Sequence, residues 1–248
     1  MDPIPILITS SVIANAPFTE LKGKEERLTS MLNGLKNLSK FIGSEVSIVL
    51  CDGSGYSFEK ERDLLHSIFE QIEIISFHNN GANISVKGKG YGEGEIIKYA
   101  LQNSQTLKDS RDFAKLTGKI WIDNYYSCLK SYNGLCGFVF ENIFRPTYID
   151  TRFYIVNRSF FEKYLVDEYL KVSDIDGCIL EKVFFNKIRT LGLMHDFALK
   201  NVPNLYGISG TTAKKVRSSR IKKLVKRFLI ILILRTRFWG FYEKNCNY

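Results

Sequence analysis

The amino-acid sequence predicts an α/β fold, in which a mainly parallel sheet carries helices on both faces. Three short apolar runs, at 4–9, 46–50 and 72–77, alternate with stretches of helical spacing at 25–41 and 58–70. This alternation is typical of parallel strands, because each connection has to cross back over the sheet, usually as a helix. With 248 residues, 45% of them hydrophobic, the chain is long enough to bury the core of such a domain.

The first elements are justified by apolar spacing and by turn residues. The strand at 4–9 opens the chain, and the helix at 25–41 places Leu28, Met31, Leu32 and Leu35 on one face. The strand at 46–50 runs into the turn Asp52-Gly53-Ser54-Gly55. After the helix at 58–70, a third apolar strand at 72–77 leads into a polar loop at 78–89.

The later elements follow from composition as well as from spacing. They are a helix at 93–102, a strand at 119–122, one or two strands within the aromatic and β-branched stretch 138–157, helices at 160–171 and 177–191, and a last strand near 193–199. We expect ligands to collect at the carboxyl ends of the parallel strands. Thr9, Ser10, Asp52 and Ser54 fall at such ends.

The segment 87–124 has features of an anion site. A glycine-rich turn, GKGYGEG, precedes a helix, and a second turn, Thr-Gly-Lys, precedes the strand at 119–122. Glycines let the backbone approach a phosphate, a helix N-terminus offers free N–H groups, and Lys87, Lys89, Lys115 and Lys119 add charge. The spacing matches neither the Gly-x-Gly-x-x-Gly fingerprint nor the Gly-x4-Gly-Lys loop. A solvated basic loop and an ordinary turn would give the same pattern.

The positive charge of the chain is concentrated in its tail. Residues 211–248 carry eleven Lys and Arg against one acid, Glu243, so the tail has a charge of +10 and residues 1–210 have −1. A protein that wraps nucleic acid would spread its basic residues over a folded face, so no specific nucleic-acid partner is expected. A local anionic surface is the expected partner.

Cysteine usage and the N-terminus predict a cytoplasmic protein. The five cysteines are odd in number and form no C-x-x-C pair, which indicates neither a disulfide framework nor a zinc site. At the N-terminus Asp2 stands where a secretion signal needs positive charge, and Pro3 and Pro5 interrupt the run, so this segment is interpreted as a strand.

The tail RIKKLVKRFLIILIL predicts a basic amphipathic helix. Its apolar stripe consists of Ile221, Leu224, Val225, Phe228, Leu229 and Leu232, and four basic residues lie off the stripe. The apolar run 228–234 is too short to span a bilayer, so we expect the helix to lodge in the membrane interface. A helix that packs on the core or mediates oligomerisation is the alternative. The predicted division is a catalytic domain at 1–212 and a membrane-associating tail at 213–248.

Short motifs follow one another along the chain in a fixed order: a polar-ended first strand, a D-G-S turn, the GKG helix, FAKLTGK before a strand, the block YIDTRFYIVNRSFF and an Ile-Leu-Glu-Lys helix. This ordered series resembles bacterial glycosyltransferases of capsule and O-antigen (lipopolysaccharide) loci. The resemblance implies the A-type glycosyltransferase fold, a single Rossmann-like nucleotide-binding domain with a mixed sheet. It covers residues 4–212 and names no donor sugar.

The resemblance also implies roles for the candidate residues. The nucleoside would contact Thr9, Ser10, Asp52 and Ser54, Arg27 would reach the base or a phosphate, Lys87, Lys89 and Lys115 would hold the diphosphate, and a lid at 207–212 would bring Gly207 and Ser209 over the donor. Many A-type enzymes place an Asp-x-Asp metal site after the strand that is predicted here at 119–122. This chain has Asp123-Asn124, a weaker site for Mg²⁺ or Mn²⁺, so the resemblance leaves two expectations: His195 completes a metal shell, or lysines replace the metal.

An inverting transfer needs a carboxylate that deprotonates the acceptor hydroxyl, and the sequence does not decide between inversion and retention. Glu181 is the first candidate, because an acid within the apolar stretch I-L-E-K-V-F-F is expected to be half-buried with a raised pKa, although a solvated helix face would also accommodate it. Asp176, Asp174 and Asp150 are the others. Asp174 and Asp176 would equally suit a helix N-cap, and Asp150 an ion pair with Arg152.

The leading hypothesis is a hexosyltransferase-like enzyme that moves a sugar from a nucleotide-sugar donor to a lipid-linked glycan. A lipid-linked acceptor explains a basic amphipathic tail, which would attach the enzyme peripherally to the cytoplasmic face of the inner membrane. A non-catalytic module that binds membranes or polyanions, and a nucleotidyltransferase, remain alternatives.

Overall fold

The computed structural model describes residues 3–14, 16–17, 19–217, 219–236 and 238–239. Within this part of the chain, six strands form the main sheet in the order β3 (Ile72–Ser76), β2 (Ile48–Asp52), β1 (Ile6–Ser10), β4 (Asp112–Thr117), β7 (Ile149–Asn157) and β6 (Cys136–Phe140). β3, β2, β1 and β4 are parallel, whereas β7 is antiparallel to both β4 and β6. The predicted mainly parallel mixed sheet is confirmed.

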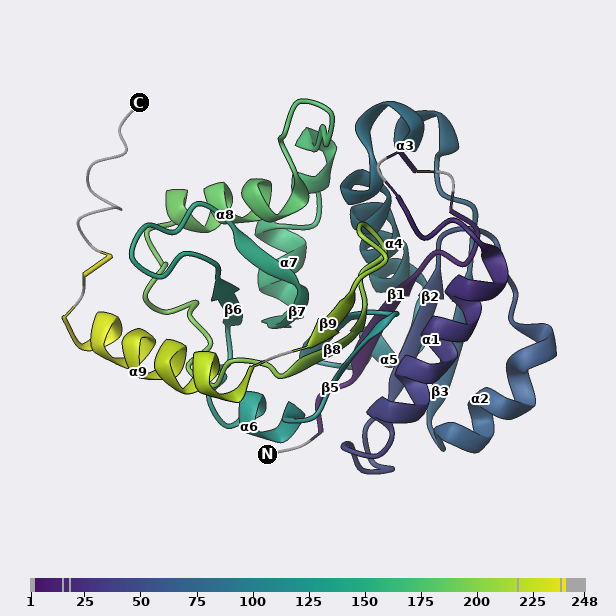
Figure 1. Ribbon diagram of the computed structural model, residues 1–248, viewed down its shortest axis with the longest axis horizontal. Coiled ribbons are helices and arrows are strands. Elements are labelled where there is room, and N and C mark those ends of the chain that lie inside the picture. The colour runs from purple at the N-terminus through teal and green to yellow at the C-terminus, as the bar shows by residue number, and fades with distance from the viewer. Residues whose placement is uncertain (1–2, 15, 18, 218, 237, 240–248) are drawn as a thin grey trace.

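Helices cover both faces of the sheet, as Figure 1 shows. α1 (Lys24–Leu38), α2 (Arg62–Ile68) and α6 (Tyr125–Leu129) pack on one face, and α4 (Lys89–Asn103), α5 (Gln105–Lys108), α7 (Arg158–Tyr164) and α8 (Leu180–Thr190) pack on the other. β1 and β2 are buried along their whole length, which is why their sequences are continuously apolar rather than alternating.

Short elements complete the described chain. They are the 3₁₀ turns η1 (Glu59–Glu61) and η2 (Glu168–Lys171), the helix α3 (Gly81–Lys87), and a small antiparallel sheet of β5 (Ile120–Ile122), β8 (Leu205–Ile208) and β9 (Lys215–Arg217). The predicted strand at 119–122 therefore belongs to this second sheet. The segment near 193–199, predicted to be a strand, makes only an isolated bridge between Phe138 and Ala198.

The fourth parallel strand was missed because Lys115 interrupts its apolar pattern. The sequence D-F-A-K-L-T places a lysine at the centre of β4, and the side chain of Lys115 is fully buried. Its ammonium group donates to Glu93, to Thr117 Oγ1 at 3.0 Å and to the carbonyl of Thr151 at 2.8 Å. These tertiary partners satisfy the charge, so the strand tolerates it.

The predicted glycine-rich turn is wrong, because Gly90, Gly92 and Gly94 lie inside a helix and only Gly88 precedes it. α4 begins at Lys89, and the preceding loop contains α3. Gly90, Gly92 and Gly94 allow close packing of α4, as a Cβ atom at Gly94 would lie 2.1 Å from the Cβ of Tyr169. These three glycines thus serve helix packing.

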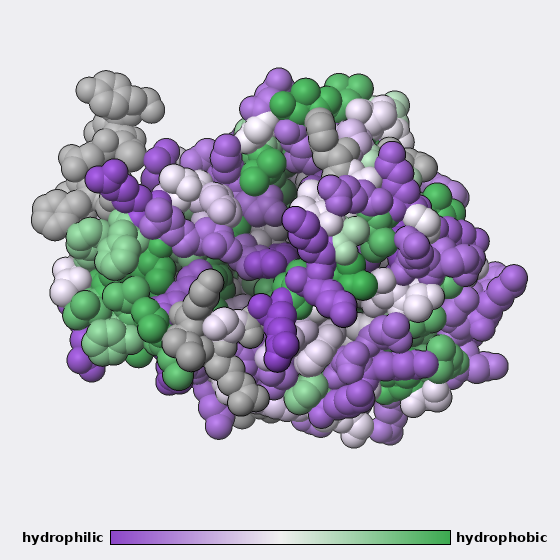
Figure 2. All heavy atoms as spheres, in the orientation of Figure 1, coloured by the Kyte–Doolittle hydropathy of each residue, from purple (hydrophilic) through white to green (hydrophobic). Residues whose placement is uncertain are grey.

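The C-terminal helix α9 (Arg220–Thr236) packs on the body of the protein. Ile230, Ile233 and Trp239 are buried in the core beside α8 and β6, and the indole N–H of Trp239 donates to the carbonyl of Ile143 at 2.8 Å. Of the predicted apolar stripe, Leu224, Val225, Phe228 and Leu232 are exposed on α9, whereas Leu229 packs against the core and the side chain of Ile221 lies outside the described part of the chain. Figure 2 shows the apolar surface over α9 at the lower left of the molecule. None of the described helices is long and apolar enough to cross a bilayer.

Candidate active site

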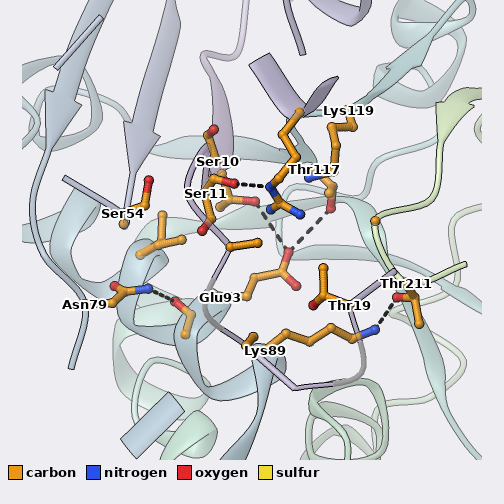
Figure 3. Close-up of a pocket in the computed structure, with 18 of the residues that line it drawn as sticks. Ser10, Ser11, Thr19, Ser54, Asn79, Lys89, Glu93, Thr117, Lys119 and Thr211 are labelled. Carbon is orange, nitrogen blue, oxygen red and sulfur yellow. Dashed lines mark hydrogen bonds between the residues drawn. The ribbon is translucent and has the colours of Figure 1, made fainter. Parts of the chain in front are cut away.

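A cavity of about 320 Å³ opens where the parallel strands β1, β2 and β4 end (Figure 3). Of the sequence-predicted residues, Thr9, Ser10, Arg27, Ser54, Lys89, Glu181 and Ser209 line it. Asp52, Lys87, Lys115, Gly207, Asp150, Asp176, Asp123 and His195 lie outside its wall. The structure thus brings together part of the predicted site.

Arg27 is held rigidly at the wall of the cavity. It is buried on α1, and its guanidinium donates to the carbonyls of Ser11 at 2.7 Å and Leu21 at 2.9 Å. Burial lowers the pKa of Arg27 below its ordinary value, and the nearby charge of Asp52 opposes this effect. These contacts fix a cation in the cavity in one orientation.

Lys119 follows the tight turn at the end of β4 and adds a second cation. The N–H of Gly118 donates to the carbonyl of Thr9 at 2.9 Å, and a Cβ atom at Gly118 would lie 2.9 Å from the same oxygen, so the turn needs glycine. Burial, and after it the charge of Arg27, lowers the pKa of Lys119 to about 8. Two cations that lose water and face each other form a site suited to an anion.

Lys115 neutralises Glu93 from beneath the cavity. Glu93 lines the cavity and pairs with Lys115, and its carboxylate also lies 3.4 Å from Thr9 Oγ1 and Thr117 Oγ1 (Figure 3). Lys115 therefore positions Glu93 and the strand ends. It does not contact the space where a diphosphate would lie, contrary to the predicted role.

Lys87 is also directed away from the cavity. Its ammonium donates to the carbonyl of Leu170 at 3.1 Å and lies 4.9 Å from the centre of the Tyr91 ring. Lys89, two residues later, donates instead to Thr211 Oγ1 and joins α4 to the loop between β8 and β9 (Figure 3).

This loop forms one edge of the cavity, where the lid was predicted. Ser209, Gly210 and Thr211 line the cavity, whereas Gly207 packs on the backbone beside it. A Cβ atom at Gly207 would lie 2.1 Å from the carbonyl oxygen of Lys119, and its φ of +135° favours glycine. Gly207 therefore positions the loop and offers no group to a ligand.

The part of the site predicted to bind the nucleoside contains a carboxylate with a structural role, Asp52. It also contains two residues that no sequence pattern indicated. Asp52 is buried and accepts from the N–H groups of Val12 at 2.9 Å and Ser54 at 2.7 Å, so it shapes the loops around the cavity. Asn79 and Ser11 line the cavity but were missed. The side-chain oxygen of Asn79 is buried without a hydrogen-bond partner among the described atoms, which leaves an acceptor for a ligand.

Glu181 lies in the first turn of α8 with its carboxylate in the cavity. It accepts from Thr151 Oγ1 at 3.0 Å. Burial is the largest cause that raises the pKa of Glu181, and the charge of Glu93 adds to it. A carboxylate with a raised pKa that is held by a hydrogen bond has the properties of a general base.

The other predicted carboxylates are occupied by structural contacts. Asp150 forms two bonds with the guanidinium of Arg152, at 2.8 and 2.5 Å. Asp176 accepts from Ser173 Oγ at 2.5 Å in an exposed turn. Asp174 accepts from the N–H of Gly90 in the first turn of α4 at 3.1 Å through one oxygen, and its other oxygen is buried without a hydrogen-bond partner among the described atoms.

The predicted metal ligands lie in different parts of the fold. Asp123 follows β5, while the ring of His195 packs 5.7 Å from that of Trp239 in the core beside α9. The main-sheet strand β4 ends instead before Gly118 and Lys119, so a hydroxyl of Thr117 and an ammonium group stand where the carboxylate and amide of Asp123-Asn124 were predicted. Among the described residues, no three His, Cys, Asp or Glu side chains form a metal-binding group. Arg27 and Lys119 carry positive charge and no free lone pair, so this corner does not fit a divalent cation.

Comparisons with known proteins give similar structures but no sequence family. No protein-family model matches the chain, and no curated protein matches its sequence. Solved structures similar to it include the bifunctional glycosyltransferase WbbM, at 11% identity and a TM-score of 0.46 over 75% of this chain. The match spans 38% of the length of WbbM.

Two further similar structures come from a mammal and a bacterium. Mouse xyloside xylosyltransferase 1 matches with 12% identity and a TM-score of 0.47, over 79% of this chain and 84% of its own. The glycosyltransferase GlyE of Streptococcus pneumoniae matches with 8% identity and a TM-score of 0.47, over 96% of this chain and 64% of its own.

Proposed function

We propose that this chain is a glycosyltransferase that moves a sugar from a nucleotide-sugar donor to a lipid-linked glycan in surface-polysaccharide synthesis, of the O-antigen or capsule type. The observation that carries the proposal is a single cavity at the strand ends that combines two confined cations, Arg27 and Lys119, with the carboxylate of Glu181. The cations suit the diphosphate of a donor, and the carboxylate suits the activation of a hydroxyl.

The chemistry of the cavity wall supports a donor site there. Thr9, Ser10 and Ser54, together with the unpartnered oxygen of Asn79, offer hydrogen bonds to a nucleoside. The diphosphate would lie against Arg27 and Lys119, whose charges stabilise the negative charge that grows as the sugar leaves.

In the proposed reaction, an acceptor hydroxyl attacks the anomeric carbon of the donor sugar. The new bond forms between the acceptor oxygen and this carbon, the bond from the carbon to the diphosphate oxygen breaks, and the hydroxyl proton passes to Glu181. Thr151 orients the Glu181 carboxylate, and burial keeps its pKa high enough to take the proton. The nucleoside diphosphate leaves against the two cations.

The membrane part of the proposal concerns α9. Its exposed apolar side chains, with Phe228 68% and Leu224 67% exposed, would enter the membrane interface at the cytoplasmic face of the inner membrane. The basic residues around them suit anionic lipids, each contributing about 1 kcal/mol near the surface. The enzyme would then meet an acceptor that is held in the bilayer.

Product analysis tests the reaction type. The full chain is incubated with nucleotide-sugars and a bacterial lipid extract, and the released phosphate compound is identified. We expect a nucleoside diphosphate and a labelled lipid, with both lost in Glu181→Gln. Release of inorganic pyrophosphate would instead identify a nucleotidyltransferase, and the absence of any turnover, together with the absence of donor binding, would leave a non-catalytic binding module.

A further inference from the structure

A second cavity, of about 230 Å³, lies beside the first and has a different lining. Its wall combines Arg152 of β7, Arg217 of β9, and Lys223 and Lys226 of α9. Arg152 and Val216 line both cavities, so the two spaces adjoin. No part of the donor site described above needs this second space.

The described lining of the second cavity has more positive than negative charge. Four basic side chains meet two acids, Glu141 and Asp150. Asp150 accepts two hydrogen bonds from Arg152 and so neutralises this cation. Glu141 is then the one acid of the described wall that can compensate the charges of Arg217, Lys223 and Lys226. An anion that entered the cavity would therefore gain from charges that the fold itself leaves largely uncompensated.

Lys223 and Lys226 are turned inward on α9 although both carry charge. Lys223 donates to the neutral side-chain oxygen of Asn204, and both lysines are only partly accessible. Burial is the first cause that lowers the pKa of both side chains, to about 8 for Lys223, against the opposing charges of Asp123 on Lys223 and of Glu141 on Lys226. Because burial removes water from both ammonium groups, their charges lower the stability of the folded chain. Such a cost is expected at a binding site, where the ligand supplies the compensating negative charge.

The opposite side of the same helix is apolar and exposed. Leu224, Val225, Phe228 and Leu232 lie on α9 away from the inward lysines, so the helix separates an apolar surface from a cationic cavity (Figure 2). This arrangement suits a molecule with a hydrocarbon part joined to an anionic group. A saccharide attached to that anionic group would extend past Arg152 toward Glu181, because Arg152 borders both cavities.

We propose that the second cavity binds a phosphate or diphosphate group carried by the acceptor, at the junction between its lipid and its glycan. The proposal rests on the proposed glycosyltransferase function for the identity of the acceptor. The cationic wall itself is independent of that function. Binding the acceptor by this junction would place its glycan at the catalytic carboxylate while its lipid remains along α9 in the membrane.

Calorimetric titration of the full chain with inorganic pyrophosphate tests the site. The test variant is Lys223→Gln/Lys226→Gln, and the matched control is Arg227→Gln/Arg235→Gln, which removes the same charge from exposed positions of the same helix. We expect two classes of pyrophosphate site in the unmodified chain. The test variant should lose at least about tenfold in affinity at one class, the control should keep both classes, and Lys119→Met should lose the other class.

Two results would overturn the site: both classes persist in the test variant, or the control loses as much affinity as the test variant. Melting curves verify the fold, since removal of cations that oppose folding is expected to leave the melting temperature unchanged or raised. Nucleotide-sugar binding separates this inference from the proposed function. A test variant that keeps donor binding and both pyrophosphate classes refutes the second site alone, whereas an unmodified chain with the second site but without donor binding refutes the function and with it the acceptor assignment.

Vesicle binding distinguishes an acceptor phosphate from a bilayer headgroup. The same variants are sedimented with phosphatidylglycerol vesicles. We expect the control to lose at least as much vesicle binding as the test variant, because Arg227 and Arg235 are exposed on α9 whereas Lys223 and Lys226 line the cavity, while pyrophosphate binding falls only in the test variant. Selective loss of vesicle binding in the test variant would assign the cavity to a membrane headgroup and overturn the acceptor assignment.

Discussion

Replacing Lys119 with methionine removes a cation that becomes desolvated on folding and keeps an apolar side chain of similar length. The pKa of Lys119 falls from 10.5 to about 8, chiefly through burial and then through the charge of Arg27. At about 1.4 kcal/mol for each pH unit between these values, the charged lysine opposes folding by about 3 kcal/mol at neutral pH. The variant is therefore expected to be more stable and to bind its anionic ligand less tightly.

The sign of the pH dependence follows from the lowered pKa. Because the unfolded chain holds this proton more tightly than the folded chain, the cost is present in full below pH 8 and is relieved as the pH rises toward 10.5. The advantage of Lys119→Met should thus be greatest near pH 7 and disappear above about pH 10.5. At pH 7, about 3 kcal/mol corresponds to a rise of about 6–12 °C in melting temperature for a chain of this size.

Urea denaturation at neutral and alkaline pH measures the effect. Lys130→Met is the control, since Lys130 is exposed and its loss should change the free energy of unfolding by less than about 0.5 kcal/mol. If Lys119→Met is no more stable than the unmodified chain at pH 7, or is stabilised equally at both pH values, Lys119 is not a desolvated cation and the reasoning is refuted.

Three further substitutions test other parts of the structure. Glu181→Gln should lower the rate of sugar transfer by about 10²–10⁴-fold while donor affinity is retained. In the unmodified enzyme the rate should fall as the pH drops through the raised pKa of this carboxylate. Full activity of the variant would exclude Glu181 as the base. Gly118→Ala places a Cβ atom 2.9 Å from the carbonyl of Thr9 and should lower the free energy of unfolding in urea by about 1–3 kcal/mol, whereas an unchanged midpoint would show that the turn has room. Trp239→Ala removes a fully buried ring and its bond to Ile143 and should cost about 3–5 kcal/mol by the same assay; a loss below about 1 kcal/mol would mean that the tail is not part of the core.

The sequence was sufficient to predict the parts of the fold and site that depend on local pattern. The strand–helix alternation gave the mainly parallel sheet, and the polar ends of its strands placed Thr9, Ser10 and Ser54 in the cavity. Glu181 was predicted to be half-buried because it stands in an apolar stretch, and the structure places it in the wall of the cavity. The exposed stripe of α9 followed from helical spacing.

The remaining parts depend on contacts between distant residues. The central strand β4 was not predicted because a lysine interrupts its apolar pattern. The partners that make Lys115 acceptable there, Glu93 and Thr151, lie 22 and 36 residues away in the sequence. The glycines of α4 resemble a phosphate-binding turn in the sequence, whereas in the structure Tyr169 packs on one of them, Gly94. Because β4 was not predicted, the metal site was expected after the strand at 119–122, at Asp123. In the structure the residue that follows the main-sheet strand at the cavity is Lys119.

The most direct test of the proposed donor site is thermal stabilisation of the full chain by UDP-, GDP-, dTDP- and CMP-sugars, each with Mn²⁺ and with EDTA, in the unmodified protein and in Lys119→Met. A ligand that binds only the folded state must raise the melting temperature. If Arg27 and Lys119 hold the diphosphate, one nucleotide class raises the melting temperature equally with Mn²⁺ and with EDTA, and the rise is lost in Lys119→Met. A rise that requires Mn²⁺ and persists in Lys119→Met, or no rise with any donor, would contradict it.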